Sequence, residues 1–179
     1  MNDVKIGDIM RKAVITAKQN DTIDRIAKIM AKAEIGGLVV IDQGKVVGIL
    51  TEKDIVKEVL AKDKNPKKVR VKDIMKHPVR TVLPETDIEK AIEIMRDLNI
   101  ERLPVVKGGK LIGLVTVRDI TRVEPALLEM TRQKEAAYFE PLPKEGYRLS
   151  ITGECEVCGN YSEYLKDVGG RLICEDCRE

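Results

Sequence analysis

The sequence is poor in aromatic residues, in histidine and in long apolar runs. Trp is absent, Phe occurs once and His77 is the single histidine. A lone histidine is a poor catalytic or metal-binding candidate, and the sequence contains no nucleophile–base pair, P-loop or dinucleotide fingerprint. No apolar run approaches the roughly 20 residues that span a bilayer, and the N-terminal residues lack the apolar core of a signal peptide. We therefore expect a cytoplasmic protein with no membrane contact and no enzymatic activity.

Charge is abundant but unevenly distributed. Charged residues make up 35% of the 179 residues, with a net charge of +2. Residues 1–122 carry 25 Lys and Arg against 18 Asp and Glu, a net charge of +7, whereas residues 147–179 carry 4 against 7, a net charge of −3. The first part is therefore suited to anionic ligands, and the last part is not.

Residues 4–55 repeat at residues 69–120 without a gap, 65 positions later. Of the 52 aligned pairs, 18 are identical. An internal repeat of this length indicates one supersecondary unit used twice, with each copy needing the other to bury its apolar face. A site built in one copy is therefore expected to have a counterpart in the other.

Each copy follows a β-α-β-β-α pattern. The predicted strands lie at residues 14–17, 38–41 and 46–50 in the first copy and at 79–83, 103–106 and 111–115 in the second. Apolar residues recur at helical spacing after the first strand, and the sequence Thr86-Asp-Ile-Glu89 predicts a capping box there in the second copy. Glycines predict a tight hairpin between the last two strands. The closing helix begins at Thr51 or Thr116.

We expect an α+β chain of four parts. The first repeat occupies residues 1–60 and the second residues 66–123. A helix and linker follow at 124–146, and residues 147–179 form a small β unit held by a metal.

Both closing segments contain the pattern Gly, two hydrophobic residues, Thr, any two residues, Asp. The two occurrences run from Gly48 through Thr51 to Asp54 and from Gly113 through Thr116 to Asp119. With the D-I-M lead-ins and the strand at 103–106, this pattern resembles the CBS domain, and the tandem copies resemble a Bateman module of archaeal type. The resemblance implies a pseudo-twofold domain pair, a homodimer formed through helices, and a cleft that binds AMP, ADP, ATP or S-adenosylmethionine.

By the same resemblance, Asp54 and Asp119 accept hydrogen bonds from ribose hydroxyls, and Thr51 and Thr116 face phosphate. Basic side chains supply counter-charge, while two further threonines and main chain near two valines contact the base. The predicted nucleotide-binding residues are Thr16, Val39, Thr51, Lys53 and Asp54 in the first copy and Thr81, Arg102, Val105, Thr116, Arg118 and Asp119 in the second. The second copy is the better equipped, because Gly37 replaces Arg102 in the first. The alternative is that T-x-x-D only caps a helix and binds no ligand.

All four cysteines lie in the last 25 residues and are spaced C-x2-C-x15-C-x2-C. Inside a reducing compartment such pairs are metal ligands rather than disulfides. The spacing predicts a tetrahedral zinc ribbon whose ligands are Cys155, Cys158, Cys174 and Cys177. Because so short a unit cannot form a sufficient apolar core, metal binding would supply its folding energy.

Three functions follow from these patterns. The first is a sensor that binds an adenosine nucleotide and signals to an unknown protein partner. The second is a nucleotide-gated, rubredoxin-like iron electron carrier, because the first cysteine pair, followed by Gly159 and Tyr161, resembles rubredoxin, although the second pair lacks the usual Pro and Gly. The ligand set alone does not choose between zinc and iron. The third is a regulator that binds nucleic acid through the ribbon, against which the negative charge of residues 147–179 argues.

Overall fold

The computed structural model describes residues 4–123 and 151–178. They belong to two compact units, one within residues 1–132 and the other within residues 133–179. The predicted helix and linker at 124–146 lie outside the described residues. Within the described part of the chain, no helix combines the length and apolar character needed to cross a bilayer.

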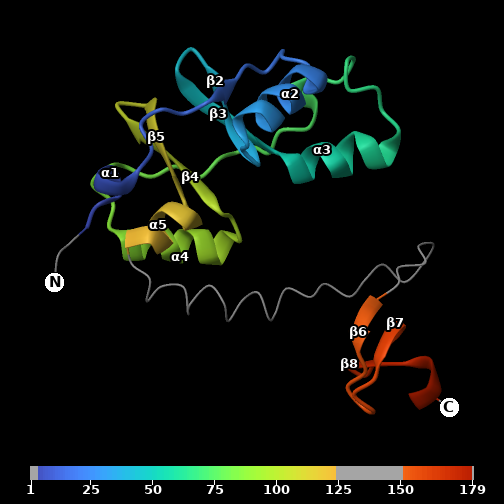
Figure 1. The fold of residues 1–179 in the computed structure, drawn as a ribbon. Helices are drawn as coiled ribbons and strands as arrows, with labels where there is room; N and C mark the ends of the chain where they lie inside the picture. The colour runs from blue at the N-terminus through green and yellow to red at the C-terminus, as the bar shows by residue number, and fades with distance from the viewer. Residues whose placement is uncertain (1–3, 124–150, 179) are drawn as a thin grey trace. The chain divides into compact units, whose positions relative to one another are not determined.

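The first unit contains both repeats (Figure 1), and along the chain each repeat has a longer helix, an antiparallel strand pair and a shorter helix. The first repeat consists of β1 (Thr16–Ala17), α2 (Ile23–Ala33), β2 (Gly37–Asp42), β3 (Lys45–Thr51), α3 (Glu52–Glu58) and the 3₁₀ helix η1 (Leu60–Lys62). The second consists of α4 (Ile88–Leu98), β4 (Arg102–Lys107), β5 (Lys110–Thr116) and α5 (Val117–Val123). The lead-ins carry α1 (Ile6–Ile9) and the 3₁₀ helix η2 (Val71–Asp73). The α+β class and the tandem arrangement are thus confirmed.

The tight hairpins predicted from the glycines are present in both repeats. Gln43 and Gly44 join β2 to β3 with φ of 48° and 80°, and Gly108 and Gly109 join β4 to β5 with φ of 57° and 76°. Two consecutive residues with positive φ match the right-handed twist of a two-residue hairpin. The carbonyl of Gly44 also accepts from the N–H of Leu111 at 3.1 Å, so the first hairpin touches β5 of the second repeat.

Of the strand predicted at 14–17 only the end forms, as β1 (Thr16–Ala17), and the strand predicted at 79–83 is reduced to one bridge. β1 pairs with β2 in parallel, with Thr16 beside Val39, whereas the second copy has a single parallel bridge between Val82 and Val105. Val82 N donates to the carbonyl of Pro104 at 3.0 Å, but the next hydrogen bond toward the N-terminus requires an N–H at position 104. Proline lacks that donor, so the ladder stops.

The capping box predicted at Thr86 is wrong. Helix α4 begins at Ile88 with Asp87 as its N-cap, and the Thr86 hydroxyl instead accepts from Leu83 N at 3.2 Å. The Asp87 carboxylate forms an ion pair with Lys5 of the first lead-in. A contact between the repeats therefore replaces the local cap.

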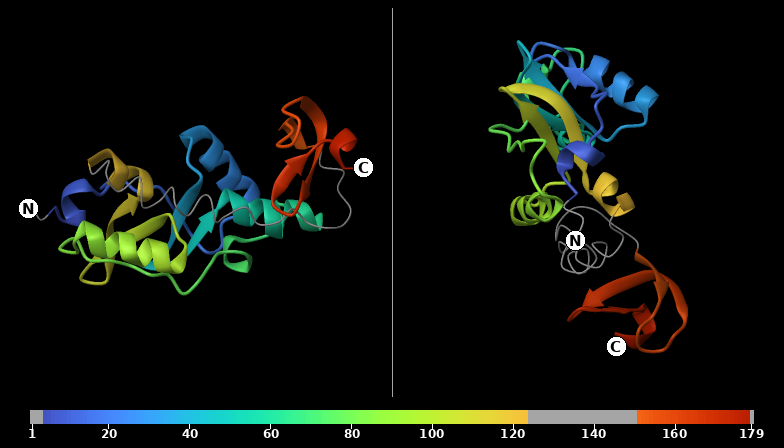
Figure 2. Two further views of the ribbon diagram at one scale, coloured as in Figure 1. Left: turned by 90° about the horizontal axis from the view of Figure 1, so that it is seen from below. Right: turned by 90° about the vertical axis from the view of Figure 1, so that its left-hand side faces the viewer.

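Each apolar core draws on both repeats because the lead-ins are exchanged. Ile6, which is fully buried, packs with α4, β4 and β5, and Val71 and Ile74 pack with α2, β2 and β3. Figure 1 shows α1 next to α5 of the second repeat, and both views in Figure 2 agree. The full burial of an Ile or Val side chain contributes about 1.5–3 kcal/mol, so each lead-in stabilises the repeat to which it does not belong.

Two glycines make this exchange sterically feasible. A Cβ at Gly48 would overlap the sulfur of Met75 from the second lead-in, and a Cβ at Gly113 would overlap the sulfur of Met10 from the first. The glycine of the G-h-h-T-x-x-D pattern is therefore the position where the other repeat's methionine lies against the strand.

The second unit is a three-stranded antiparallel sheet in the order β6 (Ile151–Glu154), β7 (Tyr161–Val168) and β8 (Arg171–Ile173), followed by the 3₁₀ helix η4 (Glu175–Cys177). Its buried cluster consists of Leu165 and Ile173 with the sulfurs of Cys155 and Cys174. So few buried apolar side chains do not stabilise an independent domain. Two of the four cysteines, Cys155 and Cys174, are therefore part of its buried centre.

Candidate functional site

The two aspartates of the repeated pattern are buried and occupy equivalent positions. Asp54 is 6% exposed and Asp119 is 7% exposed. In each case Oδ2 accepts from the threonine three residues earlier: from Thr51 N at 3.0 Å and Thr51 Oγ1 at 2.5 Å, and from Thr116 N at 3.0 Å and Thr116 Oγ1 at 2.6 Å. The helix-capping interpretation of T-x-x-D is therefore correct for the local geometry. This cap uses Oδ2 and leaves Oδ1 for another partner.

That partner is a basic side chain from the lead-in of the other repeat. Arg11 Nε donates to Asp119 Oδ1 at 2.9 Å, and Lys76 Nζ lies 3.2 Å from Asp54 Oδ1. Arg11 and Lys76 are themselves 65 positions apart. The candidate site is therefore built twice, each time from both repeats.

Backbone pairing holds each basic residue in place. Arg11 exchanges two hydrogen bonds with Leu114 of β5, at 2.9 and 3.0 Å, and Lys76 exchanges two with Ile49 of β3, at 3.1 and 2.8 Å. Each lead-in thus adds one rung to the edge of the other repeat's hairpin, beside the strand that ends in the site threonine. The backbone hydrogen bonds, rather than the side-chain ion pair, therefore hold each basic residue beside its carboxylate.

Arg102 of the second repeat extends over the first. Its Cα lies opposite Thr116 in the β4–β5 register, yet its Nε and Cζ lie 3.3 Å from the place of a Cβ on Gly37. Gly37 pairs with Thr51 in the first repeat. The glycine that replaces arginine in the first copy therefore leaves room for the arginine of the second.

Of the two valines that were predicted to lie near the base, one lies on the site face of its sheet and the other lies in the apolar core. Thr16 and Val39 are register partners and share the face that carries Gly37 and Thr51, turned away from the first core. Val105 instead lies in the second core, and only its main chain is available to a ligand. Residues two apart share a face, so Pro104 is the second-copy residue on the site face.

The other predicted basic residues are less tightly placed. Lys53 and Arg118 follow the site threonines by two positions and are exposed on α3 and α5. Thr81, the counterpart of Thr16, is half-buried immediately before Val82. The structure thus groups Thr16, Thr51, Asp54 and Arg102 around the first hairpin, and Thr116 and Asp119 around the second.

The sequence analysis missed Arg11 and Lys76. The usable signal was their shared place in the repeat, since each follows an I-M pair and each is basic. That signal does not reveal the partner, because the pairing crosses between repeats.

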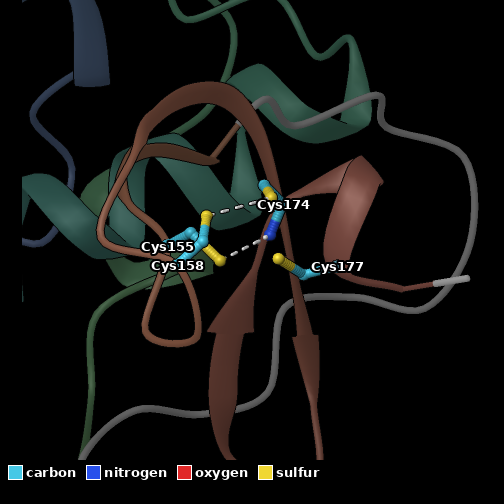
Figure 3. A group of neighbouring side chains, drawn as sticks. All are labelled: Cys155, Cys158, Cys174 and Cys177. Atoms are coloured by element: carbon cyan, nitrogen blue, oxygen red, sulfur yellow. Dashed lines mark hydrogen bonds between the residues drawn. The ribbon is translucent and has the colours of Figure 1, made fainter.

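The four cysteines form one cluster in the second unit. Cys155 and Cys158 lie in the loop after β6, Cys174 follows β8 and Cys177 lies on η4. The four sulfurs lie within 4.8 Å of one another, and Figure 3 shows the side chains converging. In a tetrahedral site with Zn–S bonds of about 2.3 Å, neighbouring sulfurs are about 3.8 Å apart, and Cys158 Sγ lies 3.8 Å from Cys174 Sγ. The residues therefore fit a four-thiolate metal site.

Main-chain donors make one of these sulfurs more acidic than the others. The backbone N–H groups of Cys174 and then Cys158 lower the pKa of Cys155 to about 6, and Cys174 N lies 3.3 Å from its sulfur. Side-chain hydrogen bonds with Cys174 and Cys158, then burial, raise the pKa of Cys177 to about 12. Burial also raises the pKa of Cys174. The same N–H groups that lower the pKa of Cys155 also stabilise a thiolate ligand, whereas metal binding at Cys174 and Cys177 has to displace a proton from a more basic thiol.

Comparison with known proteins gives consistent matches. The model of the CBS domain matches residues 6–61 and 71–125. An uncharacterized protein of Methanopyrus kandleri is 38% identical over 182 residues, covering 100% of this chain and 93% of that protein. Inosine-5′-monophosphate dehydrogenase of Methanocaldococcus jannaschii is 37% identical over 120 residues, covering 66% of this chain and only 23% of the enzyme.

Among solved structures, the chain is similar to the CBS-domain pair of protein MJ0100 in complex with 5′-methylthioadenosine and S-adenosyl-L-methionine. The TM-score is 0.62 at 35% identity, and the match covers 68% of this chain and 96% of that one. Both the tandem repeat and its fold thus have well-matched counterparts.

Proposed function

The chain belongs to the CBS-domain family, and on that premise we propose that it is a regulatory module that binds an adenosine nucleotide beside Asp54 and Asp119. AMP, ADP, ATP and S-adenosylmethionine are the candidate ligands. The similar MJ0100 pair, whose structure contains adenosine compounds, supports this ligand class.

The observation that carries the proposal is how the two oxygens of each buried carboxylate are paired. Each keeps one oxygen in a local cap and turns the other toward a cation from the far lead-in, on the side of the hairpin that carries the site threonine. Vicinal hydroxyls of a ribose donate well to such an oxygen, because a carboxylate accepts about four hydrogen bonds. The basic surroundings favour a negatively charged ligand.

A thermal-shift panel of AMP, ADP, ATP, S-adenosylmethionine and NAD tests the proposal. The proteins are the wild type and the variants Asp54→Asn, Asp119→Asn and, as a matched control, Asp21→Asn. Asp21 also accepts from a main-chain N–H and pairs with Arg25, but it lies on the loop before α2. A ligand at 100 times its dissociation constant stabilises a protein by about 2.7 kcal/mol, which raises the melting temperature by several degrees.

We expect at least one compound to raise the melting temperature of the wild type and the Asp21 variant, and the rise to shrink in one or both site variants. If no compound stabilises the wild type, the aspartates are helix caps only. If both site variants respond like the wild type, the ligand binds elsewhere.

Signalling in this proposal consists of a change in the relative placement of the two repeats or of two protomers. A ligand shifts such an equilibrium only by its differential affinity for the two arrangements. Because each carboxylate pairs with the other repeat's lead-in, a ligand at Asp119 alters a contact between repeats. An unknown protein partner would read that change through the ribbon or through the predicted helix after the second repeat.

We propose that the second unit is a structural zinc ribbon rather than an iron centre. The convergence of the four sulfurs supports metal binding, and the absence of Pro and Gly at the second cysteine pair favours zinc over a rubredoxin-type site. Thiolate ligands persist in a reducing compartment, so the proposal includes a cytoplasmic location. A negative net charge at the ribbon, to which four thiolates with one divalent ion add more, disfavours a nucleic-acid partner.

Metal analysis of protein purified without added metal separates the alternatives. One zinc per chain in a colourless protein supports the ribbon. Iron with a visible absorption band would instead favour an electron carrier. Salt-sensitive DNA binding by the intact chain would favour the nucleic-acid alternative.

We also propose that two copies pair through the helical face of the first unit. A groove of about 450 Å³ runs between α2 and α3, and Val56 of its lining is 55% exposed. Leu60, just beyond α3, is 58% exposed. A second copy that places the same face on this groove would bury both side chains in an isologous contact.

A further inference from the structure

The ion pairs Arg11–Asp119 and Lys76–Asp54 are a feature of this site that the pattern T-x-x-D alone does not predict. In each pair, Oδ2 of the carboxylate is taken by the cap and Oδ1 holds only the cation among the described residues. A ribose hydroxyl that reaches the carboxylate therefore arrives beside that cation.

Both cations keep donors that the protein does not use. Arg11 engages Asp119 through Nε, and within the described part of the chain its two terminal nitrogens make no hydrogen bond. The side chains of Arg11 and Lys76 are 48% and 71% exposed, whereas the carboxylates that they touch are buried. The inner end of each pair is thus fixed and the outer end is open to a second anion.

The pairs are not needed to hold the lead-ins. Two backbone hydrogen bonds fix each basic residue to its strand, and the burial of Ile6 or of Val71 anchors the segment. Loss of the cation therefore leaves the site framework in place and changes its charge.

We propose that Arg11 and Lys76 are the specificity-determining residues that make each site prefer a phosphorylated adenosine over a neutral one, Arg11 at Asp119 and Lys76 at Asp54. The inference rests on the proposed nucleotide site. A ribose bound to Oδ1 brings its 5′-substituent to the open end of the cation, which then bridges carboxylate and phosphate. Arg11 does this with a planar fork of donors, Lys76 with a single ammonium, so the preference for phosphate is larger at the Asp119 site.

Isothermal titration with AMP and with adenosine tests this inference, because the two compounds differ only in the phosphate. The proteins are the wild type, Arg11→Gln, Arg11→Lys, Lys76→Gln and the control Arg25→Gln. Arg25 is also an arginine whose guanidinium pairs with an aspartate, Asp21, but it lies on the exposed face of α2. Thermal melting of each variant without ligand reports whether the fold is retained.

We expect Arg11→Gln to weaken AMP binding about tenfold or more at one site while adenosine binds as well as before or more tightly. Arg11→Lys should recover part of the AMP affinity, Lys76→Gln should lower AMP affinity by a smaller factor, and Arg25→Gln should change neither. If Arg11→Gln does not fold, the comparison of AMP with adenosine on Arg11→Lys and Lys76→Gln decides the question.

Equal weakening of AMP and adenosine by Arg11→Gln would mean that Arg11 only positions Asp119, and unchanged AMP binding would mean that it takes no part. Either result overturns the inference. A wild type that binds S-adenosylmethionine or adenosine but not AMP also overturns it, while the proposed function survives. A wild type that binds none of these compounds and neither ADP nor ATP refutes the proposed function itself.

Discussion

Arg11 Nε lies 2.9 Å from Asp119 Oδ1, although the two residues are 108 positions apart and belong to different repeats. The same relationship joins Lys76 to Asp54. A duplicated chain in which each copy completes the site of the other behaves as a single module.

The exchange of the lead-ins predicts that a core mutation acts on the opposite repeat. Ile6→Ala should destabilise the second core by about 2–5 kcal/mol, since a buried Ile is replaced by a cavity. Hydrogen exchange should then accelerate most in α4, β4 and β5. For Ile74→Ala the acceleration should instead fall on α2, β2 and β3, while truncation of the exposed Leu98 should have little effect. Acceleration confined to the mutated copy would contradict the exchange.

The contact between Gly48 and Met75 predicts strong coupling. Gly48→Ala should cost about 1–3 kcal/mol, because its new Cβ displaces the methionine side chain. Met75→Ala removes the overlap, so the double variant should be more stable than the sum of the two single effects predicts. Urea unfolding of the four proteins completes this cycle. Additive effects would show that the glycine is not retained for this contact.

Metal removal should unfold the second unit and spare the first. The ribbon buries few apolar side chains besides Leu165 and Ile173, so its stability depends on the metal. A strong chelator, or Cys158→Ser, should make residues 151–178 sensitive to protease while the melting of the first unit is unchanged. Protection of the ribbon that persists without metal would contradict this account.

Acidification should release the metal. Binding replaces thiol protons, so affinity falls as pH falls. Main-chain donors lower the pKa of Cys155 to about 6, so protons compete least with the metal at this ligand and more strongly at Cys174 and Cys177, whose pKa values are raised. The stability that a depressed thiol pKa gives to the folded ribbon is present above the ordinary thiol pKa and disappears as the pH falls through about 6, so acid weakens folding and metal binding together. A zinc indicator should record the main release at acidic pH; complete retention at pH 4 would refute the assignment of four thiolate ligands.

The proposed dimer face predicts that a negative charge introduced at Val56 disrupts the dimer, whereas one introduced at Leu83 does not. Val56→Asp should convert a dimer to a monomer in size-exclusion chromatography with light scattering. Leu83→Asp is the matched control, because both side chains are 55% exposed but Leu83 lies away from the α2–α3 groove. Equal effects of the two substitutions, or none, would remove the groove as the contact.

Much of this fold follows from local sequence signals. The hairpin glycines, the helical spacing of Ile23, Ile26 and Met30 and the T-x-x-D caps all act within a few residues, and the structure agrees with them. The cysteine spacing likewise predicts the cluster, because each pair forms its own tight turn.

The parts that sequence patterns missed depend on the other repeat. Thr86 does not cap helix α4, because Asp87, which pairs with Lys5 of the other lead-in, is its N-cap. Arg102 was assigned to its own copy, but Gly37 leaves space for it in the first. Such contacts join residues that no local pattern links, so they become visible only once the repeats are placed together.

A crystal structure with the nucleotide that gives the largest thermal shift tests the central claim most directly. We predict that the ribose hydroxyls lie within hydrogen-bonding distance of Asp119 or Asp54, with Arg11 or Lys76 turned toward the phosphate. A nucleotide bound elsewhere, with both carboxylates still paired to these cations as they are here, would contradict the account.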